Sequence, residues 1–317
     1  MICEYAIEPD VLIEWAKNQL SYKYIADNFG LGKSRMMAEY PKFKNWRKKL
    51  RKAWASSDIG DFEEARLTAL FSLLTEKKIK RQNYQYNGED SWLKNAEIEN
   101  QRQKPFKAII AKDNPRKKTA VLSNKNMGSW ADKYWLMNKS KRISKKAEII
   151  ASTVAPMLQN CNQFILIDPY FRASKTNWRH PLELMLIEFL KYRSDLKNIE
   201  CEIYVSASYD KAPSKEFFEK EFQNTKFKQI MPTGLSLTVK RWRHREGGEK
   251  LHDRFILTDI GGILSSYGFD EFYDYENHEQ TTSLILLEKQ DYNNLMDQYT
   301  GDSPEFDLET QFTIRKN

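Results

Sequence analysis

Cysteine is scarce in this chain: only Cys3, Cys161 and Cys201 occur, without the spacing of metal ligands. Their odd number argues against a disulfide framework and a cysteine-based zinc site, and fits a reducing compartment. Long apolar runs are also missing, since none approaches the roughly 20 residues that span a bilayer. The first ten residues lack the basic and apolar segments of an export signal. We therefore expect a cytoplasmic protein without a membrane-spanning segment.

The remaining composition is that of a globular protein. The chain has 317 residues, of which 40% are hydrophobic and 13% aromatic. This content is too high for a disordered chain, and the length is about twice that of a usual domain. We therefore expect two domains.

Charge is unevenly distributed along the sequence. The 51 Lys and Arg exceed the 44 Asp and Glu, which gives a formal net charge of +7. Residues 101–150 hold 14 basic and 3 acidic residues, whereas residues 251–317 hold 4 and 14. Clustered cations favour an anionic partner because they release the counterions condensed on phosphates. The pattern predicts binding to nucleic acid, with DNA favoured over RNA; a solvated lysine-rich surface is the alternative.

Three short basic runs, at 44–52, 116–118 and 139–146, carry this prediction. In the first, apolar residues recur every three or four positions, so a helix would place the basic residues on its outer face. The residues expected to contact nucleic acid are Lys44, Arg47, Lys48, Arg51, Arg116, Lys117, Lys118, Lys141 and Arg142.

The pattern of residues 1–85 predicts an all-helical domain made of amphipathic stretches. Within it, residues 21–40 resemble a helix-turn-helix, with Ala26 where two helices would approach and Gly30 at the turn. A small helical bundle without a ligand is the alternative. The residues leading the helix that would enter a DNA groove are Lys33, Ser34 and Arg35.

A polar stretch, 86–104, predicts a linker or a solvent-exposed helix. The following segments 106–112 and 118–123 predict two strands on either side of a turn. From about residue 164 onward, apolar strands alternate with helical segments. This alternation predicts an α/β domain over 105–317, with a mixed β-sheet flanked by helices.

Histidine is rare, and one of the four histidines has a distinctive context. His252 opens the apolar segment 252–259, in which period-two alternation places His252 and Arg254 on one face, about 7 Å apart. Arginine holds two phosphate oxygens at once, while a neutral imidazole can attack phosphorus or transfer a proton. The pair therefore indicates phosphate chemistry.

The spacing His252-x-Arg254-x4-Asp259, followed by Gly261-Gly262, Ser265 and Ser266, resembles the signature motif of the phospholipase D superfamily. It is most similar to single-motif members, including the domain at the C-terminus of MIT-domain proteins, over roughly residues 164–300. The resemblance implies that His252 is the nucleophile that forms a phosphohistidine, that Arg254 stands where a lysine usually holds the phosphate, and that Asp259 is the motif aspartate. Arginine keeps the charge of lysine but changes the hydrogen-bond geometry.

Enzymes of this family use two such motifs and neither a metal nor another cofactor. Because this chain has one, the resemblance implies a homodimer that brings two copies of His252 together. A second histidine of the same chain, His244 or His278, is the alternative. The expected supporting residues are Asp168, Tyr170, Ser265, Ser266 and Asp270.

Two of these supporting residues, Asp168 and Tyr170, end the predicted strand 164–171, where open sheets bind ligands. A strand-terminating turn with a buried ring is the alternative for them. In the acidic run 270–279, Asp270, Asp274, Glu276 and His278 are metal-type donors, but their spacing matches no metal loop, so we expect a solvated loop.

Three functions remain open at this point. The first is a nuclease, which by analogy fits prokaryotic antiviral defence. The second is a catalytically silent subunit that binds nucleic acid or a partner protein in a defence or regulatory complex. The third, a phospholipid phosphodiesterase or phosphoinositide binder, is disfavoured because no amphipathic membrane helix is evident.

Overall fold

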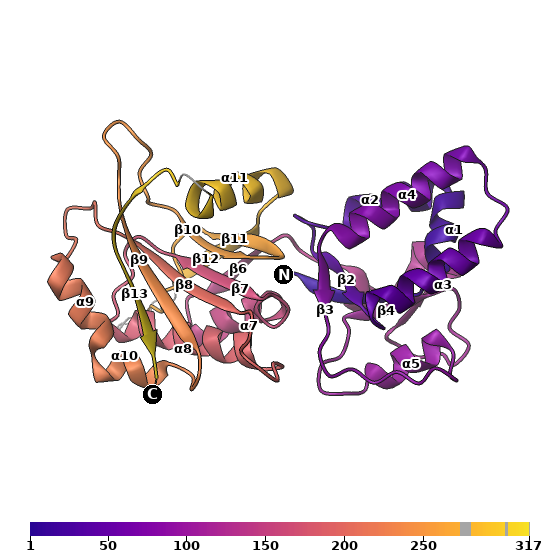
Figure 1. Ribbon diagram of the computed structural model, residues 1–317, viewed down its shortest axis with the longest axis horizontal. Helices are drawn as coiled ribbons and strands as arrows, with labels where there is room; N and C mark the ends of the chain where they lie inside the picture. The colour runs from indigo at the N-terminus through magenta and orange to yellow at the C-terminus, as the bar shows by residue number, and fades with distance from the viewer. Residues whose placement is uncertain (273–279, 302–303, 317) are drawn as a thin grey trace. The chain divides into compact units, whose positions relative to one another are not determined.

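The computed structural model describes residues 1–272, 280–301 and 304–316. The chain divides into two compact units, Met1–Asn138 (unit 1) and Lys139–Asn317 (unit 2), each with its own β-sheet (Figure 1). Among the described residues, no helix is long and apolar enough to cross a membrane.

Unit 1 contains a five-stranded sheet in the order β3-β2-β1-β4-β5, and all its neighbouring strands are parallel. The strands are β1 (Cys3–Ile7), β2 (Arg35–Glu39), β3 (Lys78–Lys80), β4 (Ala108–Ala111) and β5 (Val121–Ser123). The helices are α1 (Val11–Lys17), α2 (Gln19–Asn28), α3 (Phe43–Ala55), α4 (Asp61–Glu76), α5 (Trp92–Glu99), the 3-10 helix η1 (Asn124–Ser129) and α6 (Asp132–Trp135).

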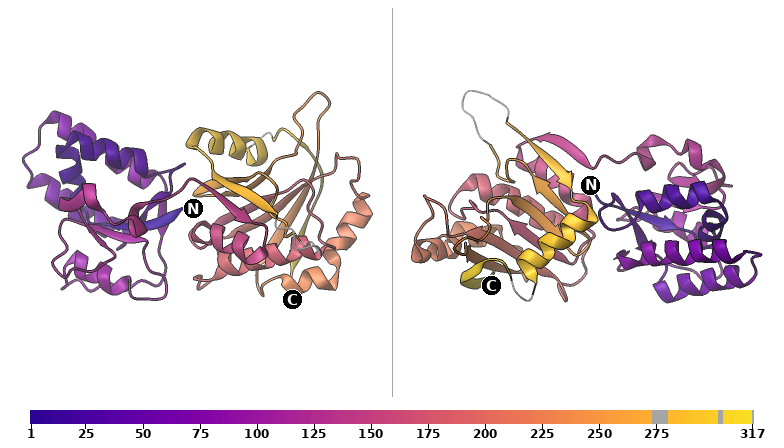
Figure 2. Two further views of the ribbon diagram at one scale, coloured as in Figure 1. Left: turned by 180° about the vertical axis from the view of Figure 1, so that it is seen from behind. Right: turned by 90° about the horizontal axis from the view of Figure 1, so that it is seen from above.

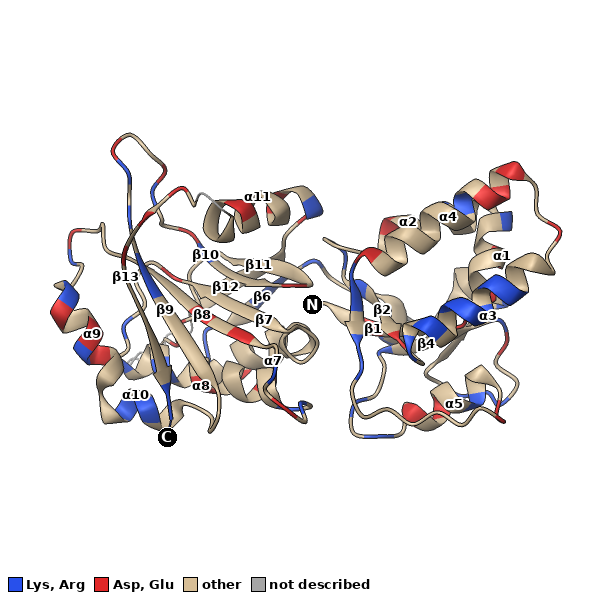
Figure 3. Cartoon of the chain, in the orientation of Figure 1, with Lys and Arg blue, Asp and Glu red and all other residues tan. Residues whose placement is uncertain are grey.

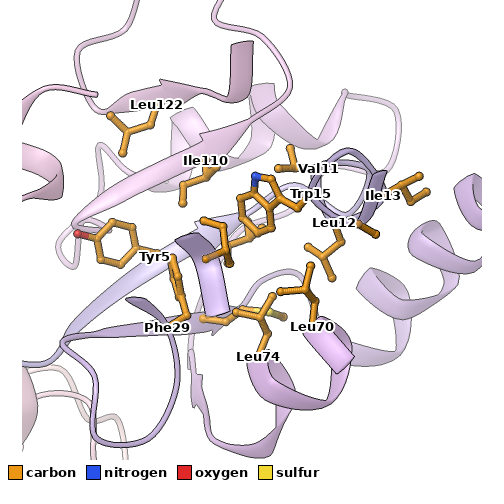
Figure 4. Packing of buried hydrophobic residues seen from close by; sticks show 14 of the residues in the cluster. Tyr5, Val11, Leu12, Ile13, Trp15, Phe29, Leu70, Leu74, Ile110 and Leu122 are labelled. Carbon is orange, nitrogen blue, oxygen red and sulfur yellow. The ribbon is translucent and has the colours of Figure 1, made fainter. Parts of the chain in front are cut away.

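Alternate residues of each strand point to opposite faces of the sheet, and helices cover both faces. Tyr5 and Ile7 of β1 pack in a core formed with helices α1 to α4, whereas Ala6 belongs to a second core with Trp92 and Ala96 of α5. Figure 4 shows the first core, where Trp15 lies among Leu and Ile side chains. Parallel sheets are stable when both faces are buried in this way.

The all-helical prediction for residues 1–85 is wrong, since β1, β2 and β3 lie within this segment. The helix-turn-helix is wrong for the same reason. Helix α2 supplies its first helix, but the expected recognition helix is replaced by strand β2, which pairs with β1. Ser34 and Arg35 are buried at the start of that strand and cannot enter a DNA groove.

Residues 86–104, predicted as a linker or exposed helix, contain α5, whose buried residues belong to unit 1. The strands predicted at 106–112 and 118–123 are present as β4 and β5. They pair in parallel and also belong to unit 1. The α/β sheet that contains Arg254 therefore begins after Asn138 rather than at residue 105.

Unit 2 contains an eight-stranded mixed sheet in the order β13-β9-β8-β7-β10-β11-β12-β6, as the sequence predicted for its type. Strands β7, β8 and β9 are parallel, and all the other neighbouring pairs are antiparallel. The strands are β6 (Ser140–Ser144), β7 (Gln163–Ile167), β8 (Glu200–Ser206), β9 (Ser236–Arg243), β10 (Arg254–Thr258), β11 (Gly261–Ser265), β12 (Thr281–Leu286) and β13 (Asp307–Arg315).

Helices cover both faces of this second sheet (Figures 1 and 2). On one face, Phe189 of α8 packs against Phe164 of β7. On the other, Tyr299 of α11 packs against Tyr204 of β8 and Phe255 of β10. The helices of unit 2 are α7 (Ala147–Leu158), α8 (Thr176–Leu190), α9 (Lys215–Gln223), α10 (Thr225–Ile230) and α11 (Lys289–Thr300).

Candidate active site

One edge of the unit 2 sheet collects polar side chains from strands that are far apart in sequence. Because β7, β8 and β9 are parallel and β10 runs opposite to β7, the carboxyl ends of the first three meet the amino end of β10. Strand β11 also ends at this edge, where Ser265 pairs with Arg254. Open α/β sheets bind ligands beyond the carboxyl ends of their strands, so this edge is the expected place for a site.

Strand register brings three predicted residues together. Phe255 of β10 pairs with Ile167 of β7, so Arg254 lies opposite Asp168, the residue that follows β7. On its other side, Arg254 pairs with Ser265 of β11. Residues opposite each other on neighbouring strands point to the same face, which places Asp168, Arg254 and Ser265 in one row.

His252 lies two residues before β10 and is exposed, with 61% of its side chain accessible. Its Nδ1 is 2.9 Å from the carbonyl oxygen of Lys250. Since a carbonyl only accepts, Nδ1 carries a proton, so the lone pair of the neutral ring is on Nε2. Of the two neutral tautomers, the Lys250 contact therefore favours the one that a nucleophile or base needs at Nε2. The Oδ1 atom of Asp253 lies 3.3 Å from Nε2 and would pair with the protonated ring.

His252 lines a pocket of about 480 Å³ at this sheet edge. Tyr170 links the pocket to the row of strand residues, because it lines the pocket while the guanidinium carbon of Arg254 lies 4.9 Å from its ring centre. Tyr170 therefore shares the pocket with His252 and also contacts Arg254. The remaining lining residues are Ser208, Tyr209, Asp210, Lys211, His244, Lys250 and Leu251.

His244, which follows β9, is a second imidazole in this pocket. Its Nε2 accepts a 2.9 Å hydrogen bond from the backbone N–H of Leu251, and Ser206 Oγ lies 3.3 Å away. Burial lowers the pKa of His244. The ring is therefore neutral with its proton on Nδ1, so it can donate a hydrogen bond but is a weak acid.

Asp168 is fully buried, and this burial raises the pKa of its carboxyl to about 7. Its Oδ1 accepts the Tyr170 N–H at 3.1 Å, as in the strand-terminating turn considered from the sequence. Within the described part of the chain, its Oδ2 and the Nε of Arg254 have no hydrogen-bond partner. Both atoms lie within 4 Å of the position that a Cβ on Gly268 would occupy, and Asp270 Oδ1 lies 2.9 Å from it, so the glycine lets these polar atoms approach one another.

Lys145 is a buried cation at this edge that the sequence did not single out as a site residue. It follows β6, and its Nζ contacts Asp270 Oδ1 at 2.6 Å and the Tyr267 carbonyl oxygen at 2.8 Å. In the sequence, Lys145 is one lysine in the basic run 139–146, and only the position of β6 at the end of the sheet brings it to the strand ends. Asp270 thus serves to hold Lys145.

The two serines of the predicted motif are structural partners of β12. Ser265 donates to the Gly268 carbonyl at 2.7 Å and lies 2.9 Å from Thr282 Oγ1. Ser266 Oγ accepts the Ser283 N–H at 2.9 Å. These contacts fix the turn that contains Gly268, so both serines shape the edge.

Asp259 does not lie at this edge. It follows the other end of β10, roughly 16 Å along the strand from Arg254. Its Oδ1 accepts the backbone N–H groups of Asn162 at 2.7 Å and Gln163 at 3.2 Å. The catalytic assignment of Asp259 is therefore not supported by its position, and the carboxylate instead holds the start of β7 against β10.

The metal-type donors of the acidic run cannot be placed, because Asp274, Glu276 and His278 lie outside the described residues. Across residues 1–272, 280–301 and 304–316, no three His, Cys, Asp or Glu side chains gather into a metal-binding group.

The predicted nucleic-acid contacts are only partly exposed. Helix α3 has the amphipathic form that the sequence predicted: Trp46 and Leu50 are buried, and basic residues follow its outer side (Figure 3). Its exposed cations include Lys44, Arg47, Lys48 and Arg51. Arg35, in contrast, is buried. Its guanidinium carbon lies 4.0 Å from the centre of the Trp135 ring, and its Nη2 donates a hydrogen bond to the Trp135 carbonyl oxygen.

The other basic runs lie on a loop and on an edge strand. Arg116, Lys117 and Lys118 are exposed between β4 and β5, where Arg116 pairs with Glu97. Lys141 and Arg142 are exposed on β6, the edge strand of the unit 2 sheet. Lys33 is partly buried in the turn between α2 and β2. The sequence missed two further cations, Lys211 and Lys250, that line the pocket.

Comparisons with known proteins relate the chain to others by structure. No protein-family model matches the sequence, and a search of curated proteins finds no match. Among solved structures, the chain is similar to a phospholipase D family member, Nuc from Salmonella typhimurium, with 7% identity, a TM-score of 0.34, and coverage of 53% of this chain and 96% of that one. It is also similar to phosphatidylserine synthase from Haemophilus influenzae Rd KW20, with 11% identity, a TM-score of 0.32, and coverage of 52% and 37%. These similarities to phospholipase D superfamily members extend over about half of the chain.

Proposed function

We propose that unit 2 is a metal-independent phosphodiesterase that cleaves nucleic acid through a phosphohistidine intermediate. One observation carries the proposal: His252 presents an Nε2 lone pair at a pocket whose wall, Tyr170, also contacts Arg254. This arrangement supplies a nucleophile and a permanent positive charge that both neighbour Tyr170 at one sheet edge. Those are the two groups that attack on a phosphodiester requires.

In the first step, His252 Nε2 attacks phosphorus, a P–N bond forms and the bond to the leaving oxygen breaks. The ring becomes positively charged, and the Lys250 carbonyl that accepts its Nδ1–H stabilises this charge. Arg254 holds the non-bridging oxygens, whose charge grows in the transition state. In the second step, water attacks phosphorus and gives a proton to the group that protonated the leaving oxygen, the P–N bond breaks and His252 is regenerated.

The leaving oxygen must receive a proton, and two sources are compatible with the site. A second copy of the chain would bring a protonated His252, which keeps the homodimer as part of the proposal. His244 of the same chain also lines the pocket. Because its Nε2 accepts the Leu251 N–H, His244 is suited to donating a hydrogen bond from Nδ1 rather than to delivering a proton. We therefore favour the second copy as the acid.

Nucleic acid is the proposed substrate because cations lie both at the pocket and on other surfaces. Lys211 and Lys250 line the pocket, Lys141 and Arg142 lie on β6, and the outer side of α3 is basic. Cations on several surfaces suit a polyanion, since each neutralised phosphate releases a counterion.

The alternative is a silent domain that binds nucleic acid or a partner without cleaving it. One observation favours this alternative: the carboxylate of Asp253 lies 3.3 Å from His252 Nε2. A negative charge there repels an incoming phosphodiester and has to turn away before attack can occur.

The test is cleavage of DNA and RNA oligonucleotides by the full chain in EDTA, for the wild type and His252→Ala. We expect cleavage by the wild type and a loss of about 10³-fold or more in the variant. The control variant is Tyr192→Ala, because Tyr192 follows α8 at the opposite edge of the sheet. This variant should cleave as well as the wild type. If the wild type cuts neither substrate, or if His252→Ala cuts equally well, the nuclease proposal fails; a retained mobility shift would then support the silent domain.

A further inference from the structure

We propose that the pocket beside His252 is a subsite for an unpaired nucleobase, so that unit 2 acts on single-stranded nucleic acid. The inference rests on the proposed function, because it places the base next to the phosphate that His252 attacks. Tyr209 is the residue that would determine this specificity, with Tyr170 as the second aromatic wall.

Two aromatic rings line the pocket. Tyr170 follows β7 and Tyr209 follows β8, and their ring centres lie 5.2 Å apart with an angle of 68° between the planes. Both side chains are partly exposed, in contrast to the buried phenylalanines of the nearby core, such as Phe171 and Phe222. Partly exposed rings at the mouth of a basic pocket are the usual means of stacking bases without reading their sequence.

Tyr209 interacts with a neighbouring ion pair. The guanidinium of Arg172, which pairs with Glu221 at 2.7 Å, interacts with the Tyr209 hydroxyl. Tyr170 also has contacts that order it. Its backbone N–H donates a hydrogen bond to Asp168 Oδ1, and its ring lies against the guanidinium of Arg254. Aromatic walls that are already ordered lose little conformational entropy when a base stacks on them.

The size and the charge of the pocket fit a nucleotide. Its volume of about 480 Å³ lies in the range of small-ligand sites and accommodates a base with its sugar. Lys211 and Lys250 outnumber the one acidic lining residue, Asp210, so the wall is positive and suits the flanking phosphates. The same lysines disfavour a cationic lipid headgroup, which aromatic rings would otherwise attract.

A base in this pocket cannot at the same time be stacked and paired within a duplex. A duplex would have to unpair and extrude the nucleotide, which costs a few kcal/mol, whereas a single strand enters without that cost. The subsite therefore predicts a preference for single strands that disappears when the stacking ring is removed.

The experiment measures binding of a 12-nucleotide DNA strand, the matched duplex, and the strand with one central abasic position, by fluorescence anisotropy. The full chain carries His252→Ala so that no substrate is cut. Tyr209→Phe keeps the ring and should bind the single strand within about 2-fold of its parent, whereas Tyr209→Ala should bind it about 5- to 150-fold more weakly. Duplex binding should be unchanged in both variants, and the Tyr209→Ala loss should shrink on the abasic strand.

Equal binding of the single strand by Tyr209→Ala and Tyr209→Phe would overturn the subsite, as would an equal loss on the duplex. Tyr209-dependent binding of phosphatidylcholine vesicles in place of DNA would also overturn it. Thermal unfolding of each variant shows whether the loop has kept its fold, and Tyr209→Trp, which restores a stacking ring, should recover binding.

The subsite and the nuclease can fail separately. If the wild type does not cut but binding depends on the Tyr209 ring, the nuclease proposal is lost and the subsite stands as a binding site. If the wild type cuts duplex and single strand equally and Tyr209→Ala cuts normally, the subsite is lost and the nuclease stands. The same oligonucleotide in RNA form shows which sugar the pocket accepts.

Discussion

Buried charges are paired differently in the two units. In unit 1, Arg81 lies between two carboxylates: its Nη1 is 3.2 Å from Glu4 Oε2 and its Nη2 is 3.2 Å from Glu99 Oε1. Both clusters contain buried atoms without a hydrogen-bond partner among the described residues: Arg81 Nη1 and the two Glu4 oxygens in unit 1, and Asp168 Oδ2 and Arg254 Nε in unit 2. The unit 1 side chains are within ion-pair distance of one another, whereas the unit 2 atoms lie beside a pocket wall, where unsatisfied polar groups are available to a ligand.

The two clusters therefore serve different purposes. The charged cluster around Arg81 holds the second core of unit 1. There the guanidinium carbon of Arg81 also lies 4.0 Å from the ring centre of Phe106. The polar side chains at the edge of the unit 2 sheet form a row, and they come from the ends of neighbouring strands. A change in the first cluster should reduce stability, and a change in the second should mainly alter function.

The largest effect is expected for Arg81→Leu. The substitution removes the cation that Glu4 and Glu99 share, although Lys104 and Arg102 still pair with them, at 3.4 Å and 3.0 Å. We therefore expect the free energy of unfolding to fall by about 3 kcal/mol, the low end for a broken buried ion pair. Urea denaturation measures the loss. Lys17→Gln, at the exposed end of α1, is the control and should change little. A loss below 1 kcal/mol would show that this ion cluster does not hold unit 1 together.

Substitutions of Arg254 test whether the unit 2 cluster serves function rather than stability. Arg254→Gln should reduce kcat/KM about 10- to 100-fold, because a hydrogen bond to a charged group contributes about 1.5–3 kcal/mol. Arg254→Lys keeps the charge and restores the residue that the resembled motif usually has, so we expect it to recover most of the activity. Equal loss in both variants would indicate that Arg254 packs against Tyr170 and does not hold a phosphate.

Asp168 gives a pH-dependent effect. Burial raises the pKa of its carboxyl to about 7, so the folded protein keeps the proton over a range in which the unfolded chain has lost it. The contribution of this group to stability is therefore lost as pH rises from about 4 to about 7. Asp168→Asn removes this dependence, and its stability relative to wild type should increase over that range by about 1–3 kcal/mol.

Urea denaturation at pH 4.5 and pH 7.5 measures this difference. Asp259→Asn at the other end of β10 is the matched control. If the stability difference between wild type and Asp168→Asn is the same at both pH values, Asp168 is not a protonated buried carboxyl.

The smallest effect is expected on the outer side of α3. The double substitution Lys48→Gln and Arg51→Gln should weaken DNA binding modestly and reduce the slope of log K against log salt by about 1 to 2. The salt dependence of anisotropy titrations measures this slope, with Lys17→Gln as the control. An unchanged slope would remove α3 from the binding surface.

The strands of unit 2 could be predicted from the sequence because they are short apolar runs bounded by polar turns. Segments such as 163–167 and 254–258 consist largely of Ile, Leu and Phe. Strand β2 of unit 1 could not, since Met36, Met37 and Ala38 favour helices in isolation. Their burial between β1 and β3 overrides this preference.

The site was predictable where a short motif or the end of a predicted strand marked it, as for Asp168 and Tyr170 after β7. The spacing of His252 and Arg254 pointed to their chemistry, whereas Lys145 and Tyr209 reach the same edge only through the strand order of the sheet. Asp259 shows the opposite case. It belongs to the same short motif, but the strand between carries it to the far end of the sheet.

The most direct test of the account is to trap the covalent intermediate. The wild-type chain is mixed with a DNA oligonucleotide in EDTA, stopped within one turnover under conditions that preserve a P–N bond, digested and analysed by mass spectrometry. We predict a phosphoryl or nucleotidyl adduct on His252, absent in His252→Ala. Cleavage with no adduct on His252, or with an adduct on another residue, would contradict the account.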